Sequence, residues 1–102
     1  MGGVDDCSIT VDLPMVEGQL VKINGQTGVV RKIRGYSLTV LAPKIGDAKP
    51  PFLIDVDGWN FRVRSRLGDC LVADLHKIEP EQRKYIKKVG RFVSLKREMA
   101  CD

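Results

Sequence analysis

The stretch Phe52-Leu-Ile-Asp-Val-Asp-Gly-Trp-Asn-Phe-Arg-Val63 decides the fold, because apolar and polar side chains alternate on both sides of a turn signal. Asp57-Gly58 is a favoured pair for a two-residue type I′ turn. Since side chains alternate along a strand, a turn there places every large apolar residue on one face. The predicted apolar pairs are Val56 with Trp59, Ile54 with Phe61 and Phe52 with Val63, and the predicted outer pairs are Asp55 with Asn60 and Leu53 with Arg62.

A second hairpin is predicted around Leu67-Gly68-Asp69, and its loop length follows from the same alternation. A two-residue loop would place Arg64 or Asp74 opposite core residues, whereas a three-residue loop keeps them outside. We therefore predict three loop residues. The resulting pairs are Val63 with Ala73 and Phe61 with Leu75 inside, and Arg62 with Asp74 and Asn60 with His76 outside.

Upstream, residues 17–41 contain three short strands, with turns marked by Asn24-Gly25 and Arg34-Gly35. The segment 36–40 alternates, with Tyr36, Leu38 and Val40 predicted to point inward. In total we predict strands near residues 19–24, 27–34, 36–42, 52–56, 59–66 and 70–77. The predicted core consists of Val21, Ile23, Leu38, Val40, Ile54, Val56, Phe61, Val63, Leu71 and Leu75.

The remaining segments are predicted from their turn and cap signals. Residues 42–51 hold three of the five prolines, which is typical of a loop. Pro80 with its acidic neighbours predicts a helix of about ten residues that ends at Gly90. Its inward stripe would be Tyr85, Ile86 and Val89, and residues 91–97 fit either a continued helix or a last strand. An alternating stretch at residues 8–13 predicts a short edge strand before Pro14.

The segment from Val16 to Ala42 resembles the KOW motif of ribosomal and transcription-elongation proteins, and also the opening of other SH3-like barrels. The resemblance rests on Glu17-Gly18, Val21-Lys22-Ile23, Gly25 and Gly28-Val29-Val30, followed by an alternating strand. It implies a small barrel that binds RNA or ribosomal surfaces. Together with the strand pattern, it leads us to expect a mainly β fold, a small SH3-like barrel of five or six short antiparallel strands with a short C-terminal helix and a basic tail.

A length of 102 residues fits one domain with one core. We expect an N-terminal arm over residues 1–15, the barrel over 16–78 and a basic helix and extension over 79–102. The net charge is +4, but residues 1–57 hold six Lys/Arg against seven Asp/Glu, while residues 58–102 hold eleven against six. The positive charge is therefore concentrated in the second half, which favours a polyanionic partner.

Two sets of basic residues form the candidate nucleic-acid-binding site. In the second half of the central hairpin, alternation predicts three arginines on one exposed face, and a run without acids follows in the C-terminal segment. The alternative interpretation is that Arg62 pairs with Asp74 and that the other charges keep the protein in solution. The candidate residues are Arg62, Arg64, Arg66, Arg83, Lys84, Lys87, Lys88 and Arg91.

We expect no enzyme activity, because His76 is the only histidine and has no nucleophile partner in a recognisable motif. No metal, nucleotide or other cofactor is implied, nor any small-molecule substrate or membrane partner. Three widely spaced cysteines and an acidic N-terminus favour the cytoplasm or another reducing intracellular compartment. The expected partner is RNA or a ribonucleoprotein. The alternative is a protein-interaction module or a small structural subunit of a larger assembly.

Overall fold

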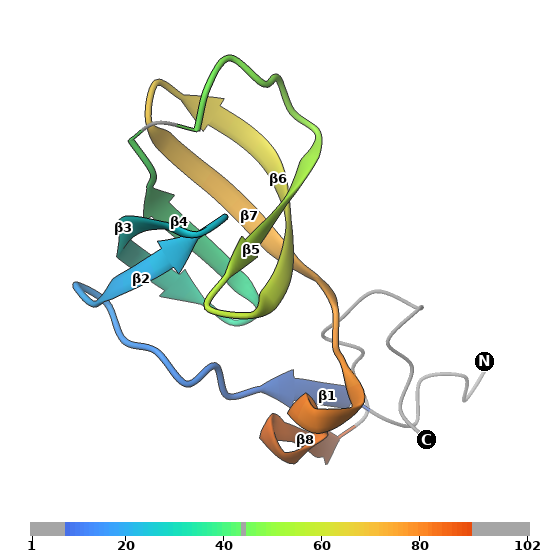
Figure 1. Cartoon of the computed structure of the whole chain (residues 1–102). Helices are drawn as coiled ribbons and strands as arrows, with labels where there is room; N and C mark the ends of the chain where they lie inside the picture. Colours follow the sequence, from blue (N-terminus) through green and yellow to red (C-terminus); the bar gives the residue numbers. More distant parts are fainter. Residues whose placement is uncertain (1–7, 44, 91–102) are drawn as a thin grey trace.

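The computed structural model describes residues 8–43 and 45–90. Within them, six antiparallel strands close into a barrel in the order β2-β3-β4-β7-β6-β5 (Figure 1). Each strand of the barrel lies where the sequence predicts one. The strands are β2 (Leu20–Ile23), β3 (Gln26–Arg34), β4 (Ser37–Leu41), β5 (Phe52–Val56), β6 (Trp59–Leu67) and β7 (Cys70–Lys77).

The barrel interior is filled by the inward side chains of these strands. All ten predicted core residues are buried, and Phe61 is the largest of those that are fully enclosed. The structure adds further buried residues to the predicted set: Val11, Met15, Val30, Ala42, Trp59 and Ala73. Tyr36, predicted in a strand, stands in the turn between β3 and β4 and packs against the core while remaining partly exposed.

The hairpin of β5 and β6 has the predicted register at every position. Phe52 pairs with Val63, Ile54 with Phe61 and Val56 with Trp59, and the outer pairs also agree. The two turn residues, Asp57 and Gly58, have φ values of 49° and 90°. Positive φ at both central positions is what a type I′ turn requires, so the local signal and the apolar pattern specify the same register.

The barrel closes where two turns meet. Strands β2 and β5 pair directly through one residue pair, Ile23 and Val56. Side chains of the turn residues complete the junction: Asn24 Oδ1 accepts a hydrogen bond from the Asp55 N–H at 2.9 Å, and Asp57 Oδ1 accepts one from the Lys22 N–H at 2.7 Å. The residues that turn the chain thus also satisfy backbone groups at the closing seam.

The predicted three-residue loop between β6 and β7 is wrong. Leu67 pairs with Cys70, so the turn has two residues, and a bulge between Val63 and Ser65 leaves Arg64 as an extra residue. The bulge reconciles a two-residue turn with a buried core, because it absorbs the one-residue shift that would otherwise invert the faces. The predicted pairs of Val63 with Ala73, Phe61 with Leu75 and Arg62 with Asp74 are confirmed; a second irregularity pairs Asn60 with Lys77 instead of His76.

The predicted C-terminal helix begins at Pro80 as expected, but it is shorter than predicted. Only Pro80–Tyr85 is helical, as the short 3-10 helix η2, and the chain then enters strand β8 (Ile86–Gly90). Strand β8 pairs with β1 (Ser8–Val11) in a two-stranded sheet, with Val11 opposite Ile86. The β-branched residues Ile86 and Val89 favour a strand, and pairing with β1 provides hydrogen-bond partners for the backbone of β8. The chain therefore continues as a strand and not as a helix. Gly90 is therefore a strand residue, and residues 91–97 lie outside the described part of the chain.

The 3-10 helix is docked on the barrel through two contacts. Gln82 is buried, and its Nε2 donates a hydrogen bond of 3.0 Å to the Gly58 carbonyl in the β5–β6 turn. The Trp59 and Tyr85 rings meet edge to face with centroids 5.5 Å apart. These contacts fix the segment that leads from β7 to the β1–β8 ribbon, which lies at one end of the barrel (Figure 1).

Candidate nucleic-acid interface

The bulge at Arg64 separates the three arginines that alternation places on one face. Arg62 stands opposite the partly exposed Asp74, on the outer face, and Arg64 is likewise exposed. Beyond the bulge, Arg66 stands opposite Leu71, which is fully buried. Since directly opposed residues share a face of the sheet, Arg66 lies on the inner side at the end of the barrel. The prediction of a single stripe of three arginines is therefore wrong.

Arg66 holds the proline-rich loop rather than facing a partner. Its Nε donates to the Gly68 carbonyl at 2.8 Å, its Nη1 to the Ala48 carbonyl at 2.6 Å and its Nη2 to the Gly46 carbonyl. A guanidinium has donors in a fixed fork, so it suits the task of joining carbonyls from two segments. This residue stabilises the loop, and its donors are already engaged.

Arg64 and Arg62 differ in their partners. Arg64 Nε lies 3.1 Å from each carboxylate oxygen of Asp74, which also accepts a hydrogen bond of 2.5 Å from Ser37 Oγ. The interpretation that Arg62 forms an ion pair with Asp74 is therefore wrong. The bulge places the Arg64 side chain beside that carboxylate instead. No hydrogen bond or ion pair joins Arg62 to another residue in the described ranges, and its side chain is exposed.

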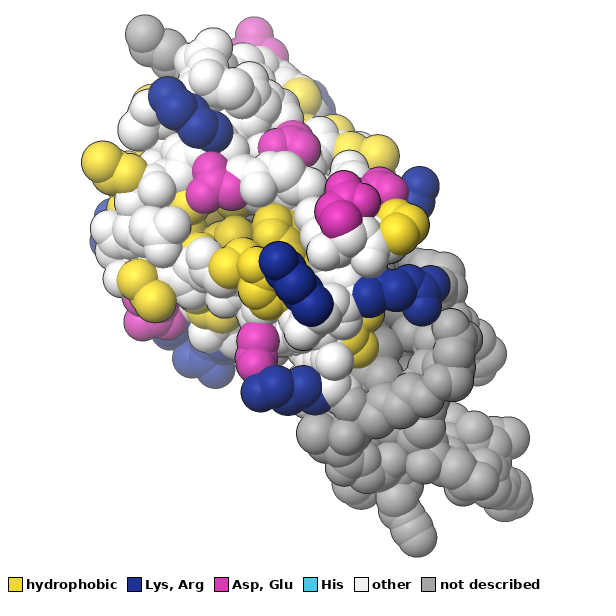
Figure 2. Space-filling view, turned by 60° about the horizontal axis from the view of Figure 1, so that its bottom comes forward, with side chains coloured by type: hydrophobic (Ala, Val, Ile, Leu, Met, Phe, Trp, Pro, Cys, Tyr) yellow, Lys and Arg dark blue, Asp and Glu magenta, His cyan; other side chains and the backbone are white. Residues whose placement is uncertain are grey.

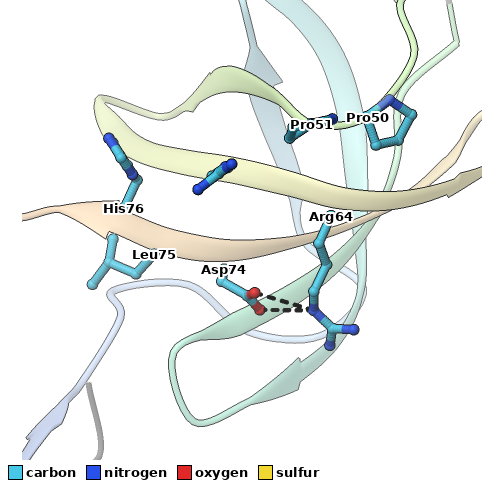
Figure 3. Close-up of a pocket in the computed structure, with 7 residues that line it drawn as sticks. Pro50, Pro51, Arg64, Asp74, Leu75 and His76 are labelled. Carbon is cyan, nitrogen blue, oxygen red and sulfur yellow. Dashed lines mark hydrogen bonds and ion pairs between the residues drawn. The ribbon is translucent and has the colours of Figure 1, made fainter. Parts of the chain in front are cut away.

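These two arginines line a hollow of about 340 Å³ beside the proline-rich loop (Figure 3). Its walls come from the end of that loop and from the outer face of β6 and β7. We call it the basic hollow; it is lined by Pro50, Pro51, Arg62, Arg64, Asp74, Leu75 and His76. In Figure 3 Arg64 reaches toward Asp74, and His76 lies on the other side of that carboxylate. The hollow thus combines one neutralised arginine, one free guanidinium and an imidazole.

Strand β3 adds basic residues that sequence reasoning did not select. Arg34 pairs with Ser37 of β4, Ser37 pairs with Asp74 of β7, and Asp74 pairs with Arg62 of β6. Directly opposed residues share a face, so Arg34 and Arg62 stand in one row across four strands. Arg34 can be placed beside Arg62 only when the register of β4 with both β3 and β7 is known. The sequence pattern of one hairpin does not give that register.

Two residues along β3 from Arg34, Lys32 belongs to the neighbouring row of the same outer face. It pairs with Thr39 of β4, which pairs with Val72 of β7. A bulge between Val30 and Lys32 makes Arg31 an extra residue, and both basic side chains are exposed. The outer face of β3, β4, β7 and β6 therefore carries basic residues at both of its sides, with Asp74 between them.

The C-terminal basic residues stand elsewhere and are partly engaged. Lys84 lies with its ammonium 5.2 Å from the Tyr85 ring centroid, and Lys87 forms an ion pair of 2.6 Å with Asp12. Arg83 is exposed, no side-chain placement is described for Lys88, and Arg91 is outside the described ranges. On the face shown in Figure 2, basic and acidic side chains are interspersed around an apolar centre, so that face does not present charge of one sign.

Two further observations concern the described residues alone. No cluster of His, Cys, Asp or Glu in them has the arrangement to hold a metal ion. None of their helices has the length and apolar character needed to cross a bilayer. Comparison with protein-family models, with curated proteins and with solved structures finds no match to this chain.

Proposed function

We propose that this chain is a non-catalytic RNA-binding module that contacts the phosphate backbone at the basic hollow. The observation that carries the proposal is Arg62, an exposed guanidinium without a partner in the described ranges that lines a hollow of about 340 Å³. A planar guanidinium matches two oxygens of a phosphate and is more weakly hydrated than an ammonium group. Arg62 is therefore the primary phosphate contact.

The rest of the outer face supports the same function. Arg34 extends the positive charge along the row of Arg62, and Lys32 adds charge in the next row. Asp74 neutralises Arg64 and is itself held by Ser37, so its carboxylate does not oppose Arg62 with a free negative charge. Contacts of this type position a nucleic acid without reading its bases, and the expected binding tolerates many sequences.

The resemblance of residues 16–42 to KOW-type and other SH3-like barrels supports RNA or a ribonucleoprotein as the partner. The closed barrel of six antiparallel strands is compatible with that fold. Cys70 is a free, half-buried thiol, which is consistent with a reducing intracellular compartment such as the cytoplasm. No cofactor is part of the proposed function.

The test is a titration of an unstructured RNA at several salt concentrations. Each phosphate contact in a single strand contributes about −0.7 to the slope of log affinity against log salt. Arg62→Ala should weaken binding and flatten that slope by about this amount. Lys22→Ala is the matched control, because it removes an exposed cation from β2 and should leave the slope unchanged. Equal affinity and slope for wild type and Arg62→Ala would refute the proposal.

A triple substitution of Lys84, Lys87 and Lys88 by Ala measures what the C-terminal run contributes. Two of these residues already have partners in the fold, Tyr85 and Asp12. We expect a smaller decrease in the salt slope per residue than for Arg62→Ala. A larger decrease per residue would move the RNA contact from the basic hollow to the C-terminal segment.

A further inference from the structure

The pairing of β6 with β7 is interrupted twice, and both interruptions border the basic hollow. The register leaves Arg64 of β6 and His76 of β7 without an opposed residue on the other strand, so each is the extra residue of a bulge. Both side chains line the hollow. Bulges redirect side chains, and they are frequent beside functional sites. The two departures from regular pairing therefore meet at one place on the barrel.

The imidazole of His76 is free to contact a ligand in the hollow. The residue is half-buried, and no hydrogen bond, ion pair or ring contact joins it to another described residue. Arg62 stands opposite Asp74, and His76 follows two residues further along β7. The side chains of Arg62 and His76 are therefore diagonal neighbours, about 7–8 Å apart. An aromatic ring without a partner thus lies beside the guanidinium without a partner.

The opposite wall of the hollow is apolar. Pro50 and Pro51 end the proline-rich loop at the start of β5, and β5 and β7 flank β6 on its two sides. The prolines and His76 therefore border the hollow from opposite sides (Figure 3). Its volume of about 340 Å³ is more than one phosphate group fills. It reaches the range of small-ligand sites, about 300–1,000 Å³, so the hollow has room for a base as well as a phosphate.

We propose that the basic hollow takes one unpaired nucleotide, with its base against the His76 ring and the two prolines and its phosphate on Arg62. This inference rests on the proposed RNA contact and adds a substrate class to it, single-stranded RNA. The bases of a duplex are paired and stacked, so they cannot enter the hollow. An unpaired base can turn outward and stack on an aromatic side chain, histidine included. Such stacking accepts any base, in agreement with a contact that does not read sequence.

The experiment is a titration of the whole chain with three RNA probes of equal length at one salt concentration. They are an unstructured single strand, the duplex of that strand with its complement, and the same strand without its bases. The strand without bases keeps the phosphates that Arg62 contacts. Stacking of one base contributes about 5-fold to 150-fold in affinity. We therefore expect the normal single strand to bind at least about fivefold more tightly than either of the other probes.

Two substitutions of His76 test whether its ring holds the base. His76→Ala removes the ring, and the variant should bind the normal single strand no more tightly than the strand without bases. His76→Phe keeps an aromatic face and should retain the preference for the normal strand. Val72→Ala is the matched control, because Val72 is a half-buried residue on the outer face of the same strand but outside the hollow. It should bind all three probes as wild type does.

The possible outcomes separate this inference from the proposed function. Equal affinity for the three probes, weakened in each case by Arg62→Ala, would overturn the single-stranded preference and leave the phosphate contact in place. No binding of any probe would refute both. A preference that survives in His76→Ala would place the base elsewhere and overturn the assignment to the hollow. Loss of the preference in His76→Phe as well as in His76→Ala would assign the contact to the imidazole nitrogens and overturn the stacking.

Discussion

The two halves of strand β6 differ in what fixes their register with the neighbouring strands. From Trp59 to Val63 the strand alternates strictly and matches β5 at every position. Beyond Val63 one residue is inserted, the faces exchange, and Arg66 stands opposite the buried Leu71. The first half is specified by its apolar side chains, because a slip would expose Phe61. The second half contains few apolar residues, so the turn and the loop contacts decide its register.

The difference determines which arginines can meet a partner. Arg62 belongs to the regular half and stands free on the outer face, whereas Arg66 belongs to the shifted half and binds three carbonyls. Arg64, the inserted residue, is exposed like Arg62 but already forms an ion pair with Asp74. Three residues that look equivalent in the sequence therefore differ: Arg62 is free for the proposed RNA contact, Arg64 is paired with Asp74 and Arg66 has a structural role.

The largest expected effect is in the regular half. Phe61→Ala removes the largest fully buried side chain and should lower the free energy of unfolding by about 3–5 kcal/mol. Leu53→Ala is the control on the neighbouring strand and should change it by less than about 0.5 kcal/mol. Chemical denaturation measures both. A loss below about 1 kcal/mol for Phe61→Ala would mean that the apolar face does not specify the register.

A smaller effect is expected at the inner arginine of the shifted half. Arg66→Ala removes three hydrogen bonds to the proline-rich loop and the turn, and should cost about 1–2 kcal/mol. Arg66→Lys keeps the charge but loses the fork of donors, so most of the loss should remain. Full recovery of stability by lysine would show that charge alone, and not the guanidinium geometry, holds the loop.

The smallest effects are expected at the outer arginines. Arg64→Ala breaks an ion pair whose arginine side chain is 59% exposed, and should cost about 0.2–1 kcal/mol. Arg62→Ala should change stability by less than about 0.5 kcal/mol, because no described residue contacts its guanidinium through a hydrogen bond or ion pair. Denaturation curves of the two variants measure both losses in the free energy of unfolding. A larger loss for Arg62→Ala than for Arg66→Ala would reverse the assignment of roles.

The sequence predicted what local alternation and turn chemistry control. It yielded the six barrel strands, the complete β5–β6 register and all ten core residues. It did not reveal the bulge, because Arg64 is an ordinary residue type and a three-residue loop gives the same pair of Val63 with Ala73 as a two-residue turn with a bulge. It predicted a short strand at residues 8–13, where β1 lies, but it missed β8 and its pairing with β1, because the two strands lie far apart along the chain.

The candidate site was predicted less well than the fold. Alternation correctly placed Arg62 on the outer face, but it could not assign Arg64 to Asp74 or Arg66 to the loop. Arg34 and Lys32 were missed because their position on the same face as Arg62 depends on the register of two further strand pairs, β3 with β4 and β4 with β7. Side-chain partners and long-range rows depend on tertiary contacts, which the pattern of a single hairpin does not contain.

The most direct test of the account is a set of cross-strand NMR contacts between β6 and β7 in the intact chain. The bulge at Arg64 predicts backbone proton contacts of Ser65 with Val72, Arg66 with Leu71 and Leu67 with Cys70. A three-residue loop without a bulge would instead join Ser65 to Leu71 and Arg66 to Cys70, which would return Arg66 to the outer face beside Arg62. The first pattern is the predicted result, and the second would contradict the division of the arginines.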